Sequence, residues 1–166
     1  MFKRLSALVA LAAIVSAEQS YRSQGLSFQL PVAFSQPAKA GLGAEELHFP
    51  ADKSPAQAEI ITFVAAAEQV KSMAEAGQPI DRYFASTYLG LDWQPEQINK
   101  AVIGDMGGRH LVFHSKLVKP CRVDIYERAL KDGRFVAVAL RTYEAVDEEQ
   151  RIEIGESLRK SLKIEP

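Results

Sequence analysis

The chain has 166 residues and a net charge of −1, with 47% hydrophobic and 25% charged residues. Ten glycines and eight prolines exclude collagen-like and low-complexity chains, and the ordinary charge content excludes a strongly disordered one. A general nucleic-acid binder carries excess positive charge to neutralise phosphates, so this balance argues against nucleic-acid binding. The length predicts a single globular domain.

The first 17 residues have the three parts of a secretory signal peptide. Lys3 and Arg4 give a cationic start, an uncharged apolar run spans 5–15, and small residues precede a cleavage point after Ala17. The apolar run is well short of the ~20 residues that span a bilayer. We therefore expect residues 1–17 to be removed and residues 18–166 to be exported as one domain, to the periplasm or outside the cell. A retained N-terminal anchor and a buried helix are the alternatives.

We expect the mature chain to carry neither a lipid anchor nor a membrane-spanning segment. No stretch after the leader is long and apolar enough to span a membrane, and no cysteine stands at the cleavage point to carry a lipid. Cys121 is the only cysteine, so no internal disulfide can form. A domain of this size buries enough surface to be stable without one.

The first part of the domain alternates between short strands and loops. Alternating apolar residues mark the half-buried strands, and prolines and glycines mark the breaks between them. The predicted elements in chain order are a polar lead-in over 18–24, a strand over 26–30, a loop over 35–43, a strand over 47–49, a turn over 51–55 and a buried strand over 60–64.

Two helices are expected in the middle of the chain. Residues 65–76 are rich in the helix-favouring Ala, Glu, Lys and Met, and Gly77 is a suitable stop. Pro79 fits the first turn of a second helix, which Gly90 ends. Its apolar face carries Ile80, Tyr83, Phe84, Thr87 and Tyr88.

The second half predicts an antiparallel meander. Residues 101–103 lead into a glycine-rich turn over 104–108, and three strands joined by tight turns follow. The predicted strands cover 111–118, 122–130 and 135–143, with a hairpin loop over 131–133. In the middle strand, Val123, Ile125 and Glu127 fall on one face.

The last element has the clearest helix signals. Asp147 is followed by Gln150 in a capping arrangement, and acidic residues occupy the first turn. Ile154, Leu158 and Leu162 form an apolar stripe. These features predict a C-terminal helix that packs on the sheet.

The start of the domain, Gly25-Leu-Ser-Phe-Gln-Leu-Pro31, resembles the opening strand of the PsbP-like and DcrB-like superfamily. The order of strands, mid-chain helix, meander and terminal helix is similar over about residues 21–164. The resemblance implies an α+β fold in which helices flank an antiparallel sheet on both sides, as an α/β/α sandwich. It also implies an accessory, adaptor or partner-binding role with no shared catalytic set. The chain departs from the bacterial lipoprotein members because it lacks their lipid-carrying cysteine.

His110, His114 and Cys121 are the candidate reactive residues. Four residues along a strand span about 13 Å, so the two histidines cannot ligate one metal, and we expect neither a metal nor another cofactor. Cys121 follows Lys119-Pro120 and precedes Arg122, and it could be a free thiol, an intermolecular disulfide partner or a nucleophile beside Asp124.

Trp93, Glu45 and Glu46 are the candidate partner-binding residues. Trp93 lies in a predicted loop, where it could anchor a partner or cover one end of the core. The Glu45-Glu46 pair could equally be a solvated edge. We expect the docking surface to involve the edge strands of the sheet and residues 36–50. The glycines over 104–108 lack the Lys-Ser/Thr of a phosphate-binding loop.

Two classes of function remain open from the sequence. The leading hypothesis is an exported, non-catalytic accessory or adaptor protein that binds another protein. A narrower form is a periplasmic immunity or inhibitor protein. The second class is an enzyme whose site combines dispersed residues such as Cys121, His110, His114 and Asp124. Carriage of a small ligand between sheet and helix is a third possibility.

Overall fold

The computed structural model describes residues 18–51, 55–115 and 119–165, and the predicted signal peptide lies outside these ranges. The described part forms two antiparallel sheets and three helices. The strands are β1 (Gln19–Ser23), β2 (Leu26–Leu30), β3 (Ala38–Gly41), β4 (Ala44–Phe49), β5 (Ala58–Ala65), β6 (Gln97–Ile103), β7 (Met106–Ser115), β8 (Cys121–Ala129), β9 (Phe135–Tyr143) and β10 (Lys163–Ile164). The helices are α1 (Ala67–Glu75), α2 (Ile80–Leu89) and α3 (Glu148–Ser161).

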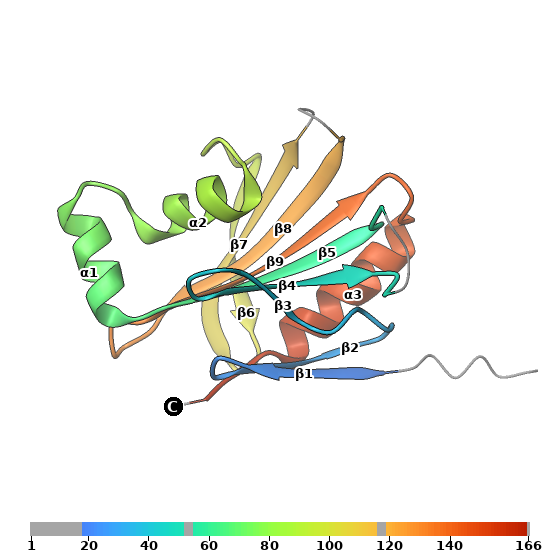
Figure 1. Cartoon of the computed structure of the whole chain (residues 1–166), viewed down its shortest axis with the longest axis horizontal. Coiled ribbons are helices and arrows are strands. Elements are labelled where there is room, and N and C mark those ends of the chain that lie inside the picture. Colours follow the sequence, from blue (N-terminus) through green and yellow to red (C-terminus); the bar gives the residue numbers. More distant parts are fainter. Residues whose placement is uncertain (1–17, 52–54, 116–118, 166) are drawn as a thin grey trace, which may run out of the picture.

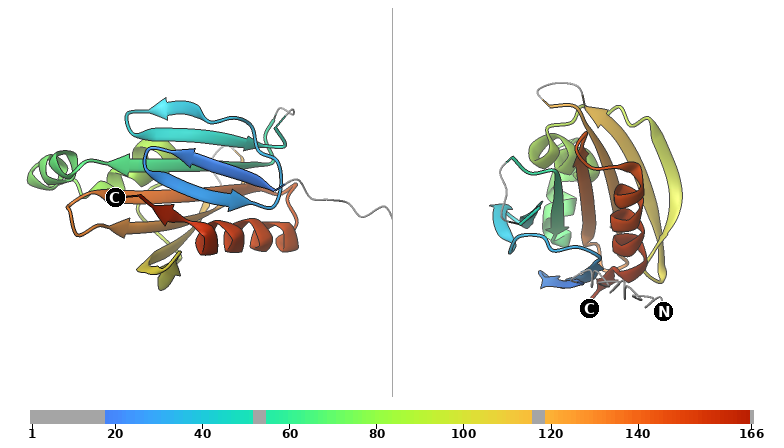
Figure 2. Two further views of the ribbon diagram at one scale, coloured as in Figure 1. Left: turned by 90° about the horizontal axis from the view of Figure 1, so that it is seen from below. Right: turned by 90° about the vertical axis from the view of Figure 1, so that its right-hand side faces the viewer.

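The main sheet has the order β3-β4-β5-β9-β8-β7-β6, and a small sheet has the order β1-β2-β10. Helices α1 and α2 lie on one side of the main sheet, and α3 lies on the other together with the small sheet (Figure 1). The β6–β7 end of the main sheet curls around α3 (Figure 2). This arrangement confirms the predicted α+β class, an antiparallel sheet flanked by helices on both sides.

Each face of the main sheet has its own apolar core because successive strand residues point to opposite faces. On the α2 side, Phe63 of β5 and Phe84 of α2 are fully buried. On the α3 side, Leu140 of β9 packs with Ile154 and Leu158 of α3. The predicted apolar stripe of the last helix is therefore confirmed as its buried face.

The predicted cap of the last helix is also confirmed. The Oδ1 atom of Asp147 accepts a hydrogen bond from the backbone N–H of Gln150 at 2.7 Å. Glu148 and Glu149 lie in the first turn of α3, and Arg159 and Lys160 lie in the last. Both sets of charges complement the helix dipole and help fix where the helix begins and ends.

Three predictions for the N-terminal half are wrong. Residues 18–24 are not a loose lead-in, because 19–23 form β1, which pairs with β2 and buries Tyr21. The loop expected over 35–43 contains β3, which pairs with β4. The helix expected from residue 65 begins at Ala67, because β5 continues to Ala65 beside β9.

The boundaries of the meander also differ from the predictions. The turn expected over 104–108 is shorter, because β7 already begins at Met106 and includes both following glycines. Residues 97–103 form β6, a complete edge strand rather than a short lead into that turn. The expected strand over 111–118 is described to Ser115, and residues 116–118 lie outside the described ranges, as do 52–54 of the expected turn over 51–55.

None of the helices in the described ranges is long and apolar enough to cross a membrane.

Candidate binding cleft

The main sheet splits between β7 and β8. Their ladder ends at the pair Arg109 and Glu127, whereas β7 stays paired with β6 as far as Met106 and β8 stays paired with β9 as far as Ala129. Among the described strands, residues 106–108 of β7 and 128–129 of β8 therefore pair with a neighbour on one side only. Unpaired strand edges of this kind can bind a further strand.

Contacts with α3 hold the β6–β7 turn away from β8. The backbone N–H of Gly104 donates to the carbonyl of Arg159 at 2.6 Å, and the Arg159 guanidinium donates to the carbonyl of Val102 at 3.1 Å. Gly104 has a φ of +62°, and a Cβ at this position would lie 2.1 Å from the Leu162 carbonyl oxygen. Only glycine fits this approach, so the sequence of the turn determines where the sheet opens.

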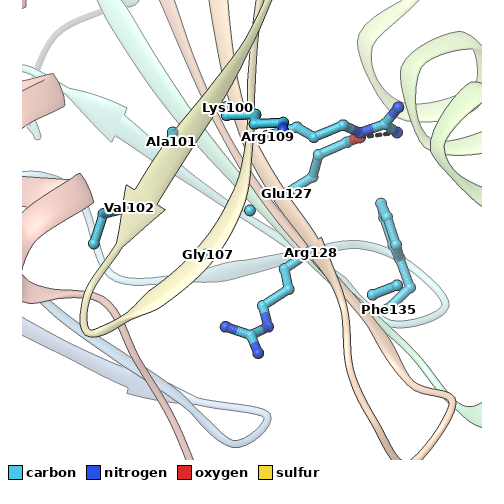
Figure 3. A pocket seen from close by; sticks show the side chains of 10 residues that line it. Lys100, Ala101, Val102, Gly107, Arg109, Glu127, Arg128 and Phe135 are labelled. Carbon is cyan, nitrogen blue, oxygen red and sulfur yellow. Dashed lines mark hydrogen bonds and ion pairs between the residues drawn. The ribbon is translucent and has the colours of Figure 1, made fainter.

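The split opens into a cleft of about 730 Å³. This volume is within the range of pockets that hold small ligands or a few residues of peptide. Its lining is largely apolar, and Gly107 and Gly108 contribute backbone without side chains. Gly107 is labelled in Figure 3. The cleft is lined by Lys100, Ala101, Val102, Gly107, Gly108, Arg109, Glu127, Arg128, Ala129 and Phe135.

Glu127 is a buried acid at the edge of this cleft. Its carboxylate is 2% exposed, and its Oε1 atom accepts from the guanidinium of Arg109, which also bonds Asp81 of α2 at 2.7 Å. Its Oε2 atom has no hydrogen-bond partner among the described residues. Burial, with the nearby Asp81 charge, outweighs the ion pair with Arg109 and raises the pKa of Glu127 to about 7.

The side chain of Arg128, the next residue of β8, points in the opposite direction to that of Glu127. Figure 3 shows Glu127 directed towards Arg109, and Arg128 extending away from that pair on the other side of β8. The Nε and Nη1 atoms of Arg128 are buried and have no hydrogen-bond partner within the described ranges. Buried polar groups are almost always paired, so these atoms of two consecutive cleft residues are available to water or to a bound group.

The raised pKa of Glu127 predicts a pH-dependent stability. The folded protein binds this proton more tightly than the unfolded chain does. The stabilising contribution of Glu127 is therefore complete below its unfolded pKa of 4.5 and is lost as the pH rises through about 7. Between pH 5 and pH 8, we expect the free energy of unfolding to fall by about 2 to 3 kcal/mol from this group.

Glu127→Gln removes this titration while keeping the shape of the side chain. Urea denaturation of both proteins at pH 5 and at pH 8 measures this effect. Between the two pH values, the wild type should lose about 2 to 3 kcal/mol more unfolding free energy than Glu127→Gln does. Glu149→Gln, at an exposed position of α3, is the matched control and should follow the wild type. If the two proteins differed in unfolding free energy by the same amount at both pH values, the raised pKa of Glu127 would be contradicted.

The two edges of the main sheet differ in how well they could bind a partner. β3 is short, and its register with β4 shifts between Lys39 and Gly41. Short, irregular edge strands are poor templates for pairing with a further strand. β6 is a regular seven-residue strand that pairs with β7 alone. Ile98 and Val102 of β6 are 54% and 56% exposed, and Val102 lines the cleft. The β6 edge is therefore the more regular of the two, and the edge within residues 36–50 is the less regular one.

His110 belongs to a charged network on the α3 side of the sheet. Its Nε2 atom lies 2.9 Å from Oδ1 of the buried Asp124, which also accepts two hydrogen bonds from Arg122 and faces Arg151. The His110 ring stacks on Tyr126 with centroids 4.7 Å apart. Burial would raise the pKa of Asp124, but the hydrogen bonds from His110 and Arg122 lower it to about 2. The network stabilises a buried carboxylate.

Cys121 lies on the other face of the sheet from that network. Its side chain packs against the α2-side core, whereas Tyr126, beside His110, belongs to the α3-side core. Burial raises the pKa of the Cys121 thiol, which opposes formation of the reactive thiolate. The structure therefore does not assemble Cys121 with His110 and Asp124.

His114 and Cys121 both line a second pocket of about 470 Å³. The Nδ1 atom of His114 is 2.8 Å from the carboxylate of Glu96, and both side chains are exposed. His114 is therefore hydrogen-bonded to Glu96 at the surface, and exposed pairs of this kind contribute little to stability.

Glu46, His48 and Glu59 form a cluster that could hold a metal ion, with ligand atoms within 4.8 Å of one another. No sequence motif marks this cluster, because Glu46 and His48 lie on β4 and Glu59 lies on β5. Glu59 already accepts hydrogen bonds from Arg141 and Tyr143, at 2.8 Å and 2.9 Å. The Arg141 charge beside Glu59 opposes a cation at this position.

Trp93 and Glu45, the two other candidate partner-binding residues, make contacts with other residues of the domain. Trp93 is half-buried, packs on Phe113 at 5.9 Å between ring centroids and lies under the guanidinium of Arg82. Glu45 accepts hydrogen bonds from Tyr21 and from Ser23, which attach β1 to β4. Neither residue lines the cleft.

A scan against protein-family models finds no match to this chain, and a search of curated proteins finds none either.

Proposed function

We propose that this chain is an exported accessory protein without catalytic activity, and that it binds an extended segment of another protein in the β7–β8 cleft. The observation that carries the proposal is the meeting of unpaired strand edges and unused buried polar groups in one cleft. An extended peptide fits both features, because its backbone carries N–H donors and C=O acceptors along its length. Export rests on the signal-peptide pattern of residues 1–17.

Apolar surface beside the cleft supports a protein partner. Val102 lines the cleft, and Ile98 lies four residues away on the same side of β6, so the two exposed side chains continue the apolar lining along the edge strand. Exposed apolar residues next to a pocket are typical of interaction sites. Lys100 lies between them on β6. If two copies of this chain paired their β6 strands at this position, the two Lys100 side chains would face each other and their like charges would oppose the pairing.

Two further observations favour a role without catalysis. Cys121, the candidate nucleophile, is separated by the sheet from the His110 and Asp124 pair. The resemblance of the sequence to the PsbP-like and DcrB-like superfamily, whose members are mostly accessory proteins, agrees with a binding role.

Selection from a displayed library of random peptides tests the proposal. A selected peptide should bind the wild type, and Ala129→Trp, which places a large side chain in the cleft, should weaken binding at least tenfold. Ala38→Trp, at an exposed position of β3 on the opposite edge, is the matched control and should bind like the wild type. A library that yields no binder, or a peptide that binds Ala129→Trp as tightly as wild type, would overturn the proposal.

A further inference from the structure

The two unused atoms of Arg128 require a particular kind of partner. A guanidinium remains ionised at all accessible pH values, and its Nε and Nη1 atoms here are buried without an acceptor among the described residues. A carboxylate is an acceptor that a guanidinium binds strongly, because the hydrogen bonds between them are charge-assisted.

Within the described ranges, the acids near Arg128 are already paired with other arginines. Asp132 and Glu165 line a small pocket together with Arg128, but Asp132 bonds Arg134 at 2.8 Å and Glu165 bonds Arg22 at 2.7 Å. Glu127, the neighbour of Arg128 in β8, bonds Arg109. The carboxylate that would satisfy Arg128 is therefore expected to come from a ligand.

Glu127 adds a second requirement. Its free Oε2 atom can accept a hydrogen bond when ionised and can donate one when protonated. A peptide group supplies both an N–H and a C=O, so it satisfies either state. Phe135, Ala129 and Val102 add apolar walls that suit an apolar side chain.

We infer that the cleft binds the C-terminal end of a partner protein, a short extended peptide with a free α-carboxylate and an apolar side chain close to it. The carboxylate pairs with Arg128, the backbone pairs with the free edge of β8 and with Glu127, and the apolar side chain packs against Phe135. This inference rests on the proposed function and specifies which part of the partner is bound.

Charge and size both favour a chain end over an internal segment. Lys100 lines the cleft and has no ion pair among the described residues, so it adds positive charge around the site. An internal segment would offer Arg128 only neutral carbonyl groups, which are weaker acceptors for a guanidinium. A cleft of about 730 Å³ holds a short end more readily than a long segment.

The test compares one peptide in two forms. Peptides are selected from a random library displayed with free C-termini, and one of them is synthesised with a fluorescent N-terminal label as the free acid and as the C-terminal amide. Fluorescence anisotropy then gives the Kd of each form for the purified protein. We expect the free acid to bind the wild type at least tenfold more tightly than the amide.

Arg128→Gln should reduce this preference to less than twofold, and a circular dichroism spectrum that matches the wild type shows that the variant is folded. Lys71→Gln, at an exposed cation of α1 that does not line the cleft, is the control and should keep the preference. Equal binding of acid and amide, with Ala129→Trp still blocking both, would overturn the C-terminal inference and leave peptide binding intact. Failure of every peptide to bind would overturn both.

Discussion

Replacing Phe63 with alanine is expected to lower the free energy of unfolding by about 3 to 5 kcal/mol. Phe63 is fully buried on β5, where its ring stacks on Phe84 of α2 with centroids 5.1 Å apart. It also contacts the rings of Tyr88 and Phe135. Alanine would leave a cavity between the sheet and α2, and the packed aromatic rings around it cannot close the gap fully.

Urea denaturation of wild type and variant measures this effect. Leu42→Ala removes an exposed apolar side chain, 81% accessible in the β3–β4 turn, and should change the free energy of unfolding by less than about 0.5 kcal/mol. A loss below about 1 kcal/mol for Phe63→Ala would contradict the α2-side core as described.

Asp124→Asn is expected to have the second large effect, a loss of about 3 kcal/mol or more in the free energy of unfolding. Asp124 is 1% exposed and is surrounded by His110, Arg122 and Arg151. The neutral amide would leave the two guanidinium groups facing each other without the charge between them. Asp105→Asn, at an exposed turn position, is the matched control and should be close to neutral in thermal or urea denaturation.

The same carboxylate predicts the response to acid. Because the pKa of Asp124 is lowered to about 2, its stabilising contribution is complete above its unfolded value near 4 and is lost as the pH falls towards 2. Wild type should therefore lose about 2 kcal/mol more than Asp124→Asn between pH 4 and pH 2. Parallel losses in the two proteins would show that Asp124 is not held in an ion-paired network.

The parts of the fold that were predictable carry strong local signals. The cap at Asp147 and the stripe through Ile154 and Leu158 define α3 without reference to the rest of the chain. The meander of β7, β8 and β9 follows from alternating apolar residues and from the hairpin loop at Gly133. In these segments local propensity and tertiary packing favour the same structure.

The strands that were missed lie at the edges of sheets. β6 begins with Gln97 to Lys100, all exposed, so it shows no alternation of buried and polar residues. β1 buries Tyr21 alone, and the whole of β3 is exposed. Pairing with a neighbouring strand determines these elements, and a sequence pattern does not record that pairing.

The cleft could not be predicted, because it depends on where the β7–β8 ladder ends and on how α3 holds the β6–β7 turn. One signal was nevertheless present in the sequence. Glu127 follows Val123 and Ile125 at the alternating positions of one strand face, which places an acid among buried apolar residues. A charged residue on an apolar face marks either an ion pair or a site, and Glu127 has both an ion pair with Arg109 and an unused oxygen.

The most direct measurement of the central claim is a titration of the ¹⁵N-labelled protein with a selected peptide, followed by two-dimensional NMR. Binding in the cleft predicts that the largest changes in amide chemical shift occur at Gly107, Gly108 and Ala129, which border the split between β7 and β8. Changes concentrated on the β3–β4 hairpin or around Cys121, with these three amides unaffected, would contradict the account.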